Sequence, residues 1–98
     1  MTEGCNNRLL ALGRRRALQA FQNSDWLAAV RGRYAEPLEF ASTRFVCQFE
    51  TPKNPLPALR RLSRFHPRLI FMLDYETDRL KGLAKVKTGQ LVHHQIRY

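Results

Sequence analysis

Apolar and polar residues alternate regularly through much of the second half of the chain. In TRFVCQFET, residues 43–51, Phe45, Cys47 and Phe49 share one side of an extended strand, and the positions between them face the other way. HPRLIFMLDYE, LKGLAKVK and QLVHHQI show the same two-residue period, and the short sequences TDR and TG separate them as turns. These segments predict strands, and the last two predict a β-hairpin.

The first part of the chain has a different pattern. NRLLAL, residues 7–12, is long enough for a strand and too short for a helix alone. Over residues 14–22 the apolar positions recur at helical spacing, and a short second helical turn follows at Trp26. Gly32 ends that turn, and residues 33–42 are predicted to be a loop that contains at most a short extended piece.

A further helix is predicted over residues 56–66. The prolines of TPKNPLP end the preceding strand, because proline cannot donate to a sheet ladder, and they suit the first turn of a helix. At about 100° per residue, one side of this helix is apolar and is expected to face the core, while arginines fall on the opposite side and face water. The apolar positions are Ala58, Leu59, Leu62 and Phe65, and the arginines are Arg60, Arg61 and Arg64.

Together these elements predict an α+β domain. The expected fold is a ferredoxin-like two-layer sandwich, in which a largely antiparallel sheet of about four strands carries two helices packed on one face. Ninety-eight residues suit one domain with one core, so residues 1–98 are expected to fold as a single unit.

Two sets of residues have the spacing of a family motif. The opening C-x-N-x-L-x-x-x-G is present as Cys5, Asn7, Leu9 and Gly13. The second set is Phe49, Thr51, Pro55, Leu62, Phe65, Pro67, Leu69, Phe71, Leu73, Tyr75, Glu76, Gly82 and Gly89. Together the two sets resemble YubB-like ferredoxin-like domains, small uncharacterised proteins carried by plasmids, phages and the bacteria that host them. The resemblance implies the same fold and a bacterial or mobile-element origin, and it implies no chemistry.

No segment has the spacing of a catalytic or metal-binding motif. The glycines never cluster into a phosphate-binding loop, and the histidines lack metal-ligand spacing with cysteine or acid. Asp74, Glu76 and Asp78 begin like a calcium loop, but the sixth position is Arg79 rather than glycine. The chain is therefore predicted to be no enzyme and to use no metal or cofactor.

Membrane insertion and secretion are not predicted. No apolar run approaches the ~18 residues of a membrane span. In MTEGCNNRLLALGRRR the arginines follow the short apolar part, whereas a secretory signal carries its positive charge first. Cys5 and Cys47 make a disulfide framework improbable. These features predict a cytoplasmic protein without membrane contact.

Positive charge is the most unusual property of the chain. Seventeen Lys and Arg residues against eight acids give a net charge of +9. Residues 51–98 hold ten of these basic residues and three of the acids, so the excess is concentrated in the second half. Such an excess favours nucleic acid or another acidic partner.

The arginines of the first helix are placed unfavourably unless something neutralises them. Arg14–Arg16 lie at the positive end of its dipole, where cations are disfavoured and a phosphate group would be stabilised. Together with the arginines of the later helix they form the candidate contact set. The predicted nucleic-acid-binding residues are Arg14, Arg15, Arg16, Arg60, Arg61, Arg64, Arg68, Lys85 and Lys87.

The leading hypothesis is a non-catalytic binding module that contacts the nucleic-acid backbone without sequence preference. Base stacking on the sheet itself is not expected, because its aromatic residues belong to the alternation sets that face the helices. These residues are Phe45, Phe49, Phe71 and Tyr75.

Two alternatives remain open. The chain is also consistent with a protein-interaction or structural domain, for example a homodimer that pairs through a sheet edge, although cationic residues such as Lys85 and Lys87 would blunt such an edge. The least favoured alternative is a small-ligand pocket or enzyme built around Tyr75, Glu76 and His94.

Overall fold

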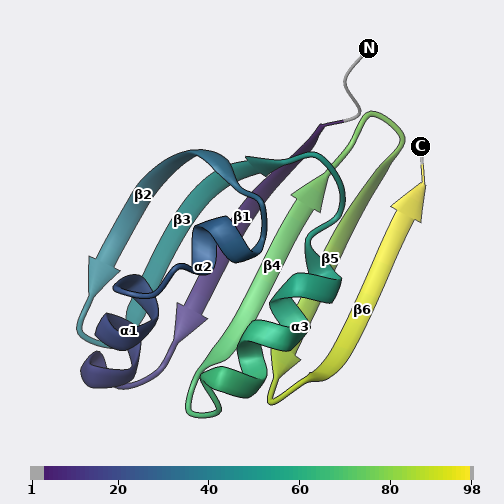
Figure 1. The fold of residues 1–98 in the computed structure, drawn as a ribbon. Helices are drawn as coiled ribbons and strands as arrows, with labels where there is room; N and C mark the ends of the chain where they lie inside the picture. The colour runs from purple at the N-terminus through teal and green to yellow at the C-terminus, as the bar shows by residue number, and fades with distance from the viewer. Residues whose placement is uncertain (1–3, 98) are drawn as a thin grey trace.

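The computed structural model describes residues 4–97, which form two layers, a six-stranded antiparallel sheet and three short helices on one of its faces (Figure 1). The strand order is β2-β3-β1-β4-β5-β6. No helix among the described residues is long and apolar enough to span a membrane. The strands are β1 (Cys5–Leu12), β2 (Arg33–Ala41), β3 (Arg44–Thr51), β4 (Ile70–Glu76), β5 (Leu80–Lys87) and β6 (Gln90–Arg97), and the helices are α1 (Arg15–Gln22), α2 (Trp26–Ala29) and α3 (Leu56–Phe65).

The prediction of a ferredoxin-like sandwich with about four strands and two helices is wrong. The sheet has six strands, and α2 adds a third helix. The strand missed most completely is β2, which lies where a loop was expected. At the edge of the sheet β2 is exposed along most of its length, so its sequence RYAEPLEFA needs no apolar alternation. Pro37 and two shifts of register against β3 mark it further as an irregular edge strand.

The core lies between the sheet and the helices. As the alternation predicts, Phe45, Cys47 and Phe49 of β3 are buried on the helix-facing side. Phe21 of α1 is fully buried at the centre of an aromatic cluster. Its ring centroid lies 5.1 Å from those of Trp26 and His66 and 5.0 Å from that of Phe71. Phe21 thereby joins α1 to α2, to the loop after α3 and to β4.

The rotation of α3 about its axis differs from the prediction. Leu59 is buried as expected, but Phe65 is 80% exposed and Ser63 is fully buried. The Ser63 hydroxyl donates to the Arg60 carbonyl and accepts the Gly89 N–H, each at 2.7 Å. This polar contact, which an apolar helical wheel does not include, fixes the face of α3 that meets the sheet.

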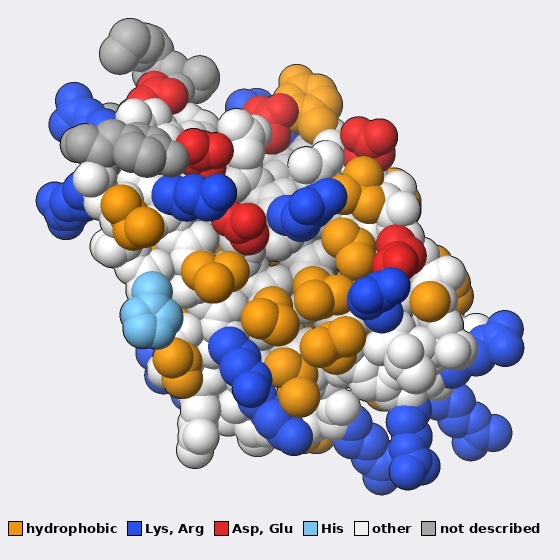
Figure 2. Space-filling view, turned by 180° about the vertical axis from the view of Figure 1, so that it is seen from behind, with side chains coloured by type: hydrophobic (Ala, Val, Ile, Leu, Met, Phe, Trp, Pro, Cys, Tyr) orange, Lys and Arg blue, Asp and Glu red, His pale blue; other side chains and the backbone are white. Residues whose placement is uncertain are grey.

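The side of the sheet that carries no helix in residues 4–97 is here called the open face (Figure 2). Its side chains are the outward-facing members of each alternating strand. Charged and polar residues are among them, and many near the centre are aliphatic. The central aliphatic residues are Leu10, Leu12, Val46, Ile70, Met72 and Leu83.

Gly82 provides a test of the packing between β4 and β5. It pairs directly with Tyr75, and a Cβ at Gly82 would overlap the Tyr75 ring. Gly82→Ala is therefore expected to lower the free energy of unfolding by about 1–3 kcal/mol, the usual cost of overpacking a core, in urea denaturation. At Gly4 a Cβ meets nothing within 4 Å, so Gly4→Ala should change stability by less than about 0.5 kcal/mol. Equal stability of the two variants would contradict this packing.

Candidate nucleic-acid interface

One end of the sheet gathers loops that are far apart in the sequence. β1, β2 and β5 end there, and β3, β4 and β6 begin there (Figure 1). The Gly13 N–H donates to the Thr43 carbonyl at 3.1 Å, which ties the loop after β1 to the β2–β3 turn. A Cβ on Gly13 would lie 3.2 Å from the Arg68 carbonyl oxygen, so the loop before β4 packs against the same point. Arg14 and Arg68 therefore lie in contacting loops.

The carboxyl end of α3 is fixed to the same end of the sheet through the β5–β6 turn. Gly89 in that turn has φ +77°, a conformation that favours glycine. Its carbonyl accepts a hydrogen bond from Arg60 Nε at 3.0 Å, and its N–H is held by Ser63. The Arg64 side chain lies against Gly89, since a Cβ there would be 2.5 Å from Arg64 Nε. Arg64 is thus held against the turn that follows Lys87, the last residue of β5.

These contacts create a surface that we call the basic end. The exposed cations that define it are Arg14, Arg15, Arg16, Arg64, Arg68 and Lys87. Arg44 lies at this end too, but an ion pair of 2.7 Å with Glu39 neutralises it. The other acids of the sheet lie farther along the strands. Figure 2 shows one group of basic side chains at the lower right of the molecule, and the acidic ones lie in its upper half among other basic side chains.

The amino end of α1 forms part of the basic end. The capping residue Arg14 is extended, and its side chain makes no capping hydrogen bond. The first turn contains no acid, so its free N–H groups meet positive rather than negative side chains. An anion bound here would be stabilised both by these N–H groups and by the arginines.

Phe65 adds an aromatic ring to the basic end. This side chain, assigned to the core by the helical pattern, instead borders a shallow hollow of about 190 Å³ between α1 and the loop after α3. Burial lowers the pKa of His66 in the same hollow, so its imidazole stays neutral at neutral pH and the charge comes from arginine and lysine. The hollow is lined by Ala17, Ala20, Phe65, His66, Pro67 and Arg68.

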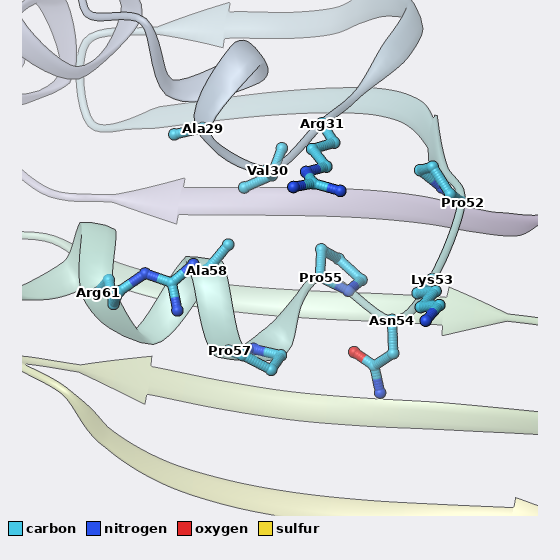
Figure 3. Close-up of a pocket in the computed structure, with 10 residues that line it drawn as sticks. All are labelled: Ala29, Val30, Arg31, Pro52, Lys53, Asn54, Pro55, Pro57, Ala58 and Arg61. Atoms are coloured by element: carbon cyan, nitrogen blue, oxygen red, sulfur yellow. The ribbon is translucent and has the colours of Figure 1, made fainter.

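The arginines of α3 are exposed as predicted, but they do not act together. Arg60 and Arg64 contact the Gly89 turn, whereas Arg61 lines a separate basic cleft of about 290 Å³ between the end of α2 and the start of α3. Arg31 and Lys53 line it as well, and Figure 3 shows Arg31 and Arg61 entering from two sides. Among the described residues, no carboxylate lines this cleft. Sequence reasoning missed Arg31 and Lys53 because each stands outside the arginine clusters.

The two predicted lysines of β5 separate in the structure. β5 is an inner strand, because β6 lies outside it, so neither lysine blunts an edge of the sheet. Lys87 belongs to the basic end. Lys85 is opposite Met72 on the open face and lies outside the basic end.

The residues suggested for a ligand pocket are not brought together. Tyr75 is buried on the helix-facing side, where its hydroxyl hydrogen-bonds His93 Nε2 at 2.5 Å and accepts a hydrogen bond from Gln95 at 2.9 Å. Glu76 and His94 lie on the open face. Tyr75 therefore serves as a packing residue over Gly82 whose hydroxyl has partners in β6.

No cluster of metal ligands is found within residues 4–97. No three His, Cys, Asp or Glu side chains in this range lie close enough to hold a metal ion. Cys5 and Cys47 are both free and buried. Burial raises the pKa of each thiol, which keeps it protonated and unreactive at neutral pH.

No family model, curated protein or solved structure matches the chain. The resemblance to YubB-like domains therefore stays a prediction from the sequence.

Proposed function

We propose that this protein is a non-catalytic module that binds single-stranded nucleic acid at its basic end, without preference for sequence. The main support for the proposal is that the basic loops and helix ends lie together around one exposed aromatic ring. Arg14–Arg16 come from the start of α1, Arg64 from α3, Arg68 from the next loop and Lys87 from β5. Their charge would hold phosphates, and Phe65 would hold a base.

The charges of the basic end suit a phosphate backbone. When exposed, unpaired cations of a protein neutralise phosphates, they displace the counterions that were condensed on the nucleic acid. The release of these counterions supplies most of the non-specific affinity. Among the described residues, the hydrogen bonds of this end join backbone groups, Ser63 and Arg60, and they leave the guanidinium groups of Arg14–Arg16 and Arg68 available. Arginine suits this role because its planar fork matches phosphate oxygens.

The single-stranded form is favoured by Phe65. Its ring is 80% exposed beside a hollow whose other lining residues are small, apolar or basic. Bases that are free of a duplex stack on such rings, while paired bases are hidden from them. The inner strands of the described sheet provide no second platform, because Phe45, Phe49 and Tyr75 are buried under the helices.

The proposal also covers the cellular compartment and the origin of the protein. Two free cysteines suit a reducing compartment. The resemblance to a family of proteins carried by plasmids, phages and bacteria suits a mobile-element or bacterial origin. We infer a cytoplasmic protein on these grounds.

Removing the arginines of α1 should weaken binding selectively. In anisotropy titrations of a labelled single strand between about 50 and 200 mM salt, contact with three to five phosphates gives a log–log slope of about −2 to −3.5. Replacing Arg14, Arg15 and Arg16 by Gln should lower the slope by about 2 in magnitude and should leave α1 folded, because the cations at its positive end are removed.

A matched control removes the same charge elsewhere. Arg33, Arg79 and Arg97 are exposed near the opposite end of the strands, and their replacement by Gln should leave most of the binding and its slope intact. If both triple variants lose affinity equally, binding depends on net charge alone and the basic end is not the site.

Phe65→Ala should weaken binding to single strands and should leave binding to duplex nearly unchanged. Loss of one stacked base costs about 1–3 kcal/mol, which is about a 5- to 150-fold weaker affinity for a single strand. Affinity for duplex should hardly change, and stability should stay within about 0.5 kcal/mol because the ring is exposed. Tyr34→Ala removes a similarly exposed ring from β2 and serves as the control. Equal losses for single strand and duplex would contradict the stacking role.

A further inference from the structure

The open face is more apolar than a water-facing sheet surface should be. An antiparallel sheet with one solvated side normally carries polar residues on that side. Here Leu10 pairs with Val46 on one neighbour and Met72 on the other, and Leu12 pairs with Ile70. Figure 2 shows the resulting aliphatic side chains running across the middle of the face. The exposure of the outermost aliphatic residues is 50% for Leu83, 60% for Val92 and 67% for Ile96. A contiguous patch of this kind marks an interaction surface.

We propose that a second copy of this chain covers the open face, related by a two-fold axis that runs parallel to the strands between β1 and β4. These are the two central strands of the order β2-β3-β1-β4-β5-β6. The axis sets β1 against β4 of the second copy, β3 against β5, and β2 against β6. Such an interface is self-complementary, because each contact occurs twice.

The central rows of the face match under this symmetry. Leu10 meets Met72 of the second copy, and Leu12 meets Ile70. In each copy these four side chains are half-buried by their neighbours in the sheet. The second copy would bury the part of each side chain that is still exposed. Face-to-face sheets pack about 10 Å apart with interleaved side chains, which these residues are long enough to provide.

The charged rows match as well. Arg8 meets Asp74 of the second copy, and Glu50 meets Lys81. Within one copy, Glu50 and Lys81 stand on strands separated by β1 and β4, about 14 Å apart at the usual strand spacing, and cannot pair. The one like-charge meeting is Arg44 with Lys87, and there Glu39 already neutralises Arg44.

The charged and aliphatic rows also decide whether the two-fold axis runs along the strands or across them. An axis across the strands would leave each strand facing its own copy and would reverse the order of the rows. Arg8 would then meet Leu10, and Asp74 would meet Met72. That arrangement buries charges against aliphatic side chains without partners, which is costly. The axis along the strands avoids this cost at Arg8 and Asp74, although it sets Lys85 against Val46 of the second copy.

The size of the face is sufficient for a specific dimer. Six strands about 4.8 Å apart and four rows of side chains span roughly 25 by 20 Å, so two faces together remove about 1,000 Å² or more from water. Edge pairing offers less, because Pro37 and the register shifts of β2 disrupt one edge of the sheet.

This inference goes beyond the proposed function and does not rest on it. An axis along the strands nevertheless brings the two basic ends to the same end of the dimer. One nucleic-acid strand would then be able to contact both, which raises the effective affinity.

Sedimentation velocity from about 1 to 100 µM tests the dimer, because self-association follows mass action. The unaltered chain should change from monomer to dimer within this range. Glu50→Lys and Lys81→Glu should each weaken association about tenfold or more, since each creates two like-charge contacts. The double variant E50K/K81E should recover to within about threefold of the unaltered chain, because the exchanged charges meet again.

Two controls keep the outcomes distinct. Circular dichroism checks that every variant is folded, and the basic-end variant R14Q/R15Q/R16Q should dimerise normally even if nucleic-acid binding fails. A chain that stays monomeric up to 100 µM overturns the proposal. A double variant no better than the weaker single variant overturns it too, because Glu50 and Lys81 have no contact within one copy that could explain recovery.

Discussion

The packing of Phe21 determines where the functional surface of this protein lies. Its buried ring contacts Trp26, His66 and Phe71, and so holds α1 against α2, the loop after α3 and the sheet. Arg14–Arg16 begin the helix that carries Phe21, and Arg68 lies two residues after His66. One hydrophobic cluster therefore brings cations from separate segments to one end of the sheet, although the cations repel one another. The free energy of burying this ring offsets that repulsion.

The two sides of the sheet carry different chemistry. The helix layer and the basic end hold most of the unpaired arginines, while the acids on the sheet lie on the open face among its lysines and aliphatic residues. An excess of one charge suits a polyanion, and a balanced pattern around an apolar centre suits a protein surface. Apart from Lys87, which belongs to both surfaces, this division allows nucleic acid and a second copy of the chain to bind through different residues.

The sequence predicted the strands that gain a buried face and missed features set by tertiary contacts. Period-two alternation identified β3 to β6, and it assigned the inner residues of β3 and β4 correctly, because burial of one face imposes that period. β2 left no such signal at the exposed edge, so the strand count and the ferredoxin-like assignment were wrong. The helical pattern placed Phe65 inside, since the contact between Ser63 and Gly89 that rotates α3 joins distant residues. Arg31, Lys53 and Arg44 likewise became relevant only through their neighbours in space.

The most direct test of the account is amide chemical-shift mapping of the labelled protein during titration with a short single-stranded oligonucleotide. If the basic end binds the oligonucleotide, the shifts should concentrate at residues 13–18, 64–69 and 87–89, where the basic end and Phe65 lie. The amides of Leu10, Met72 and Leu83 on the open face should not move. Shifts concentrated on the open face, with the basic end unaffected, would contradict the assignment of nucleic-acid binding to the basic end.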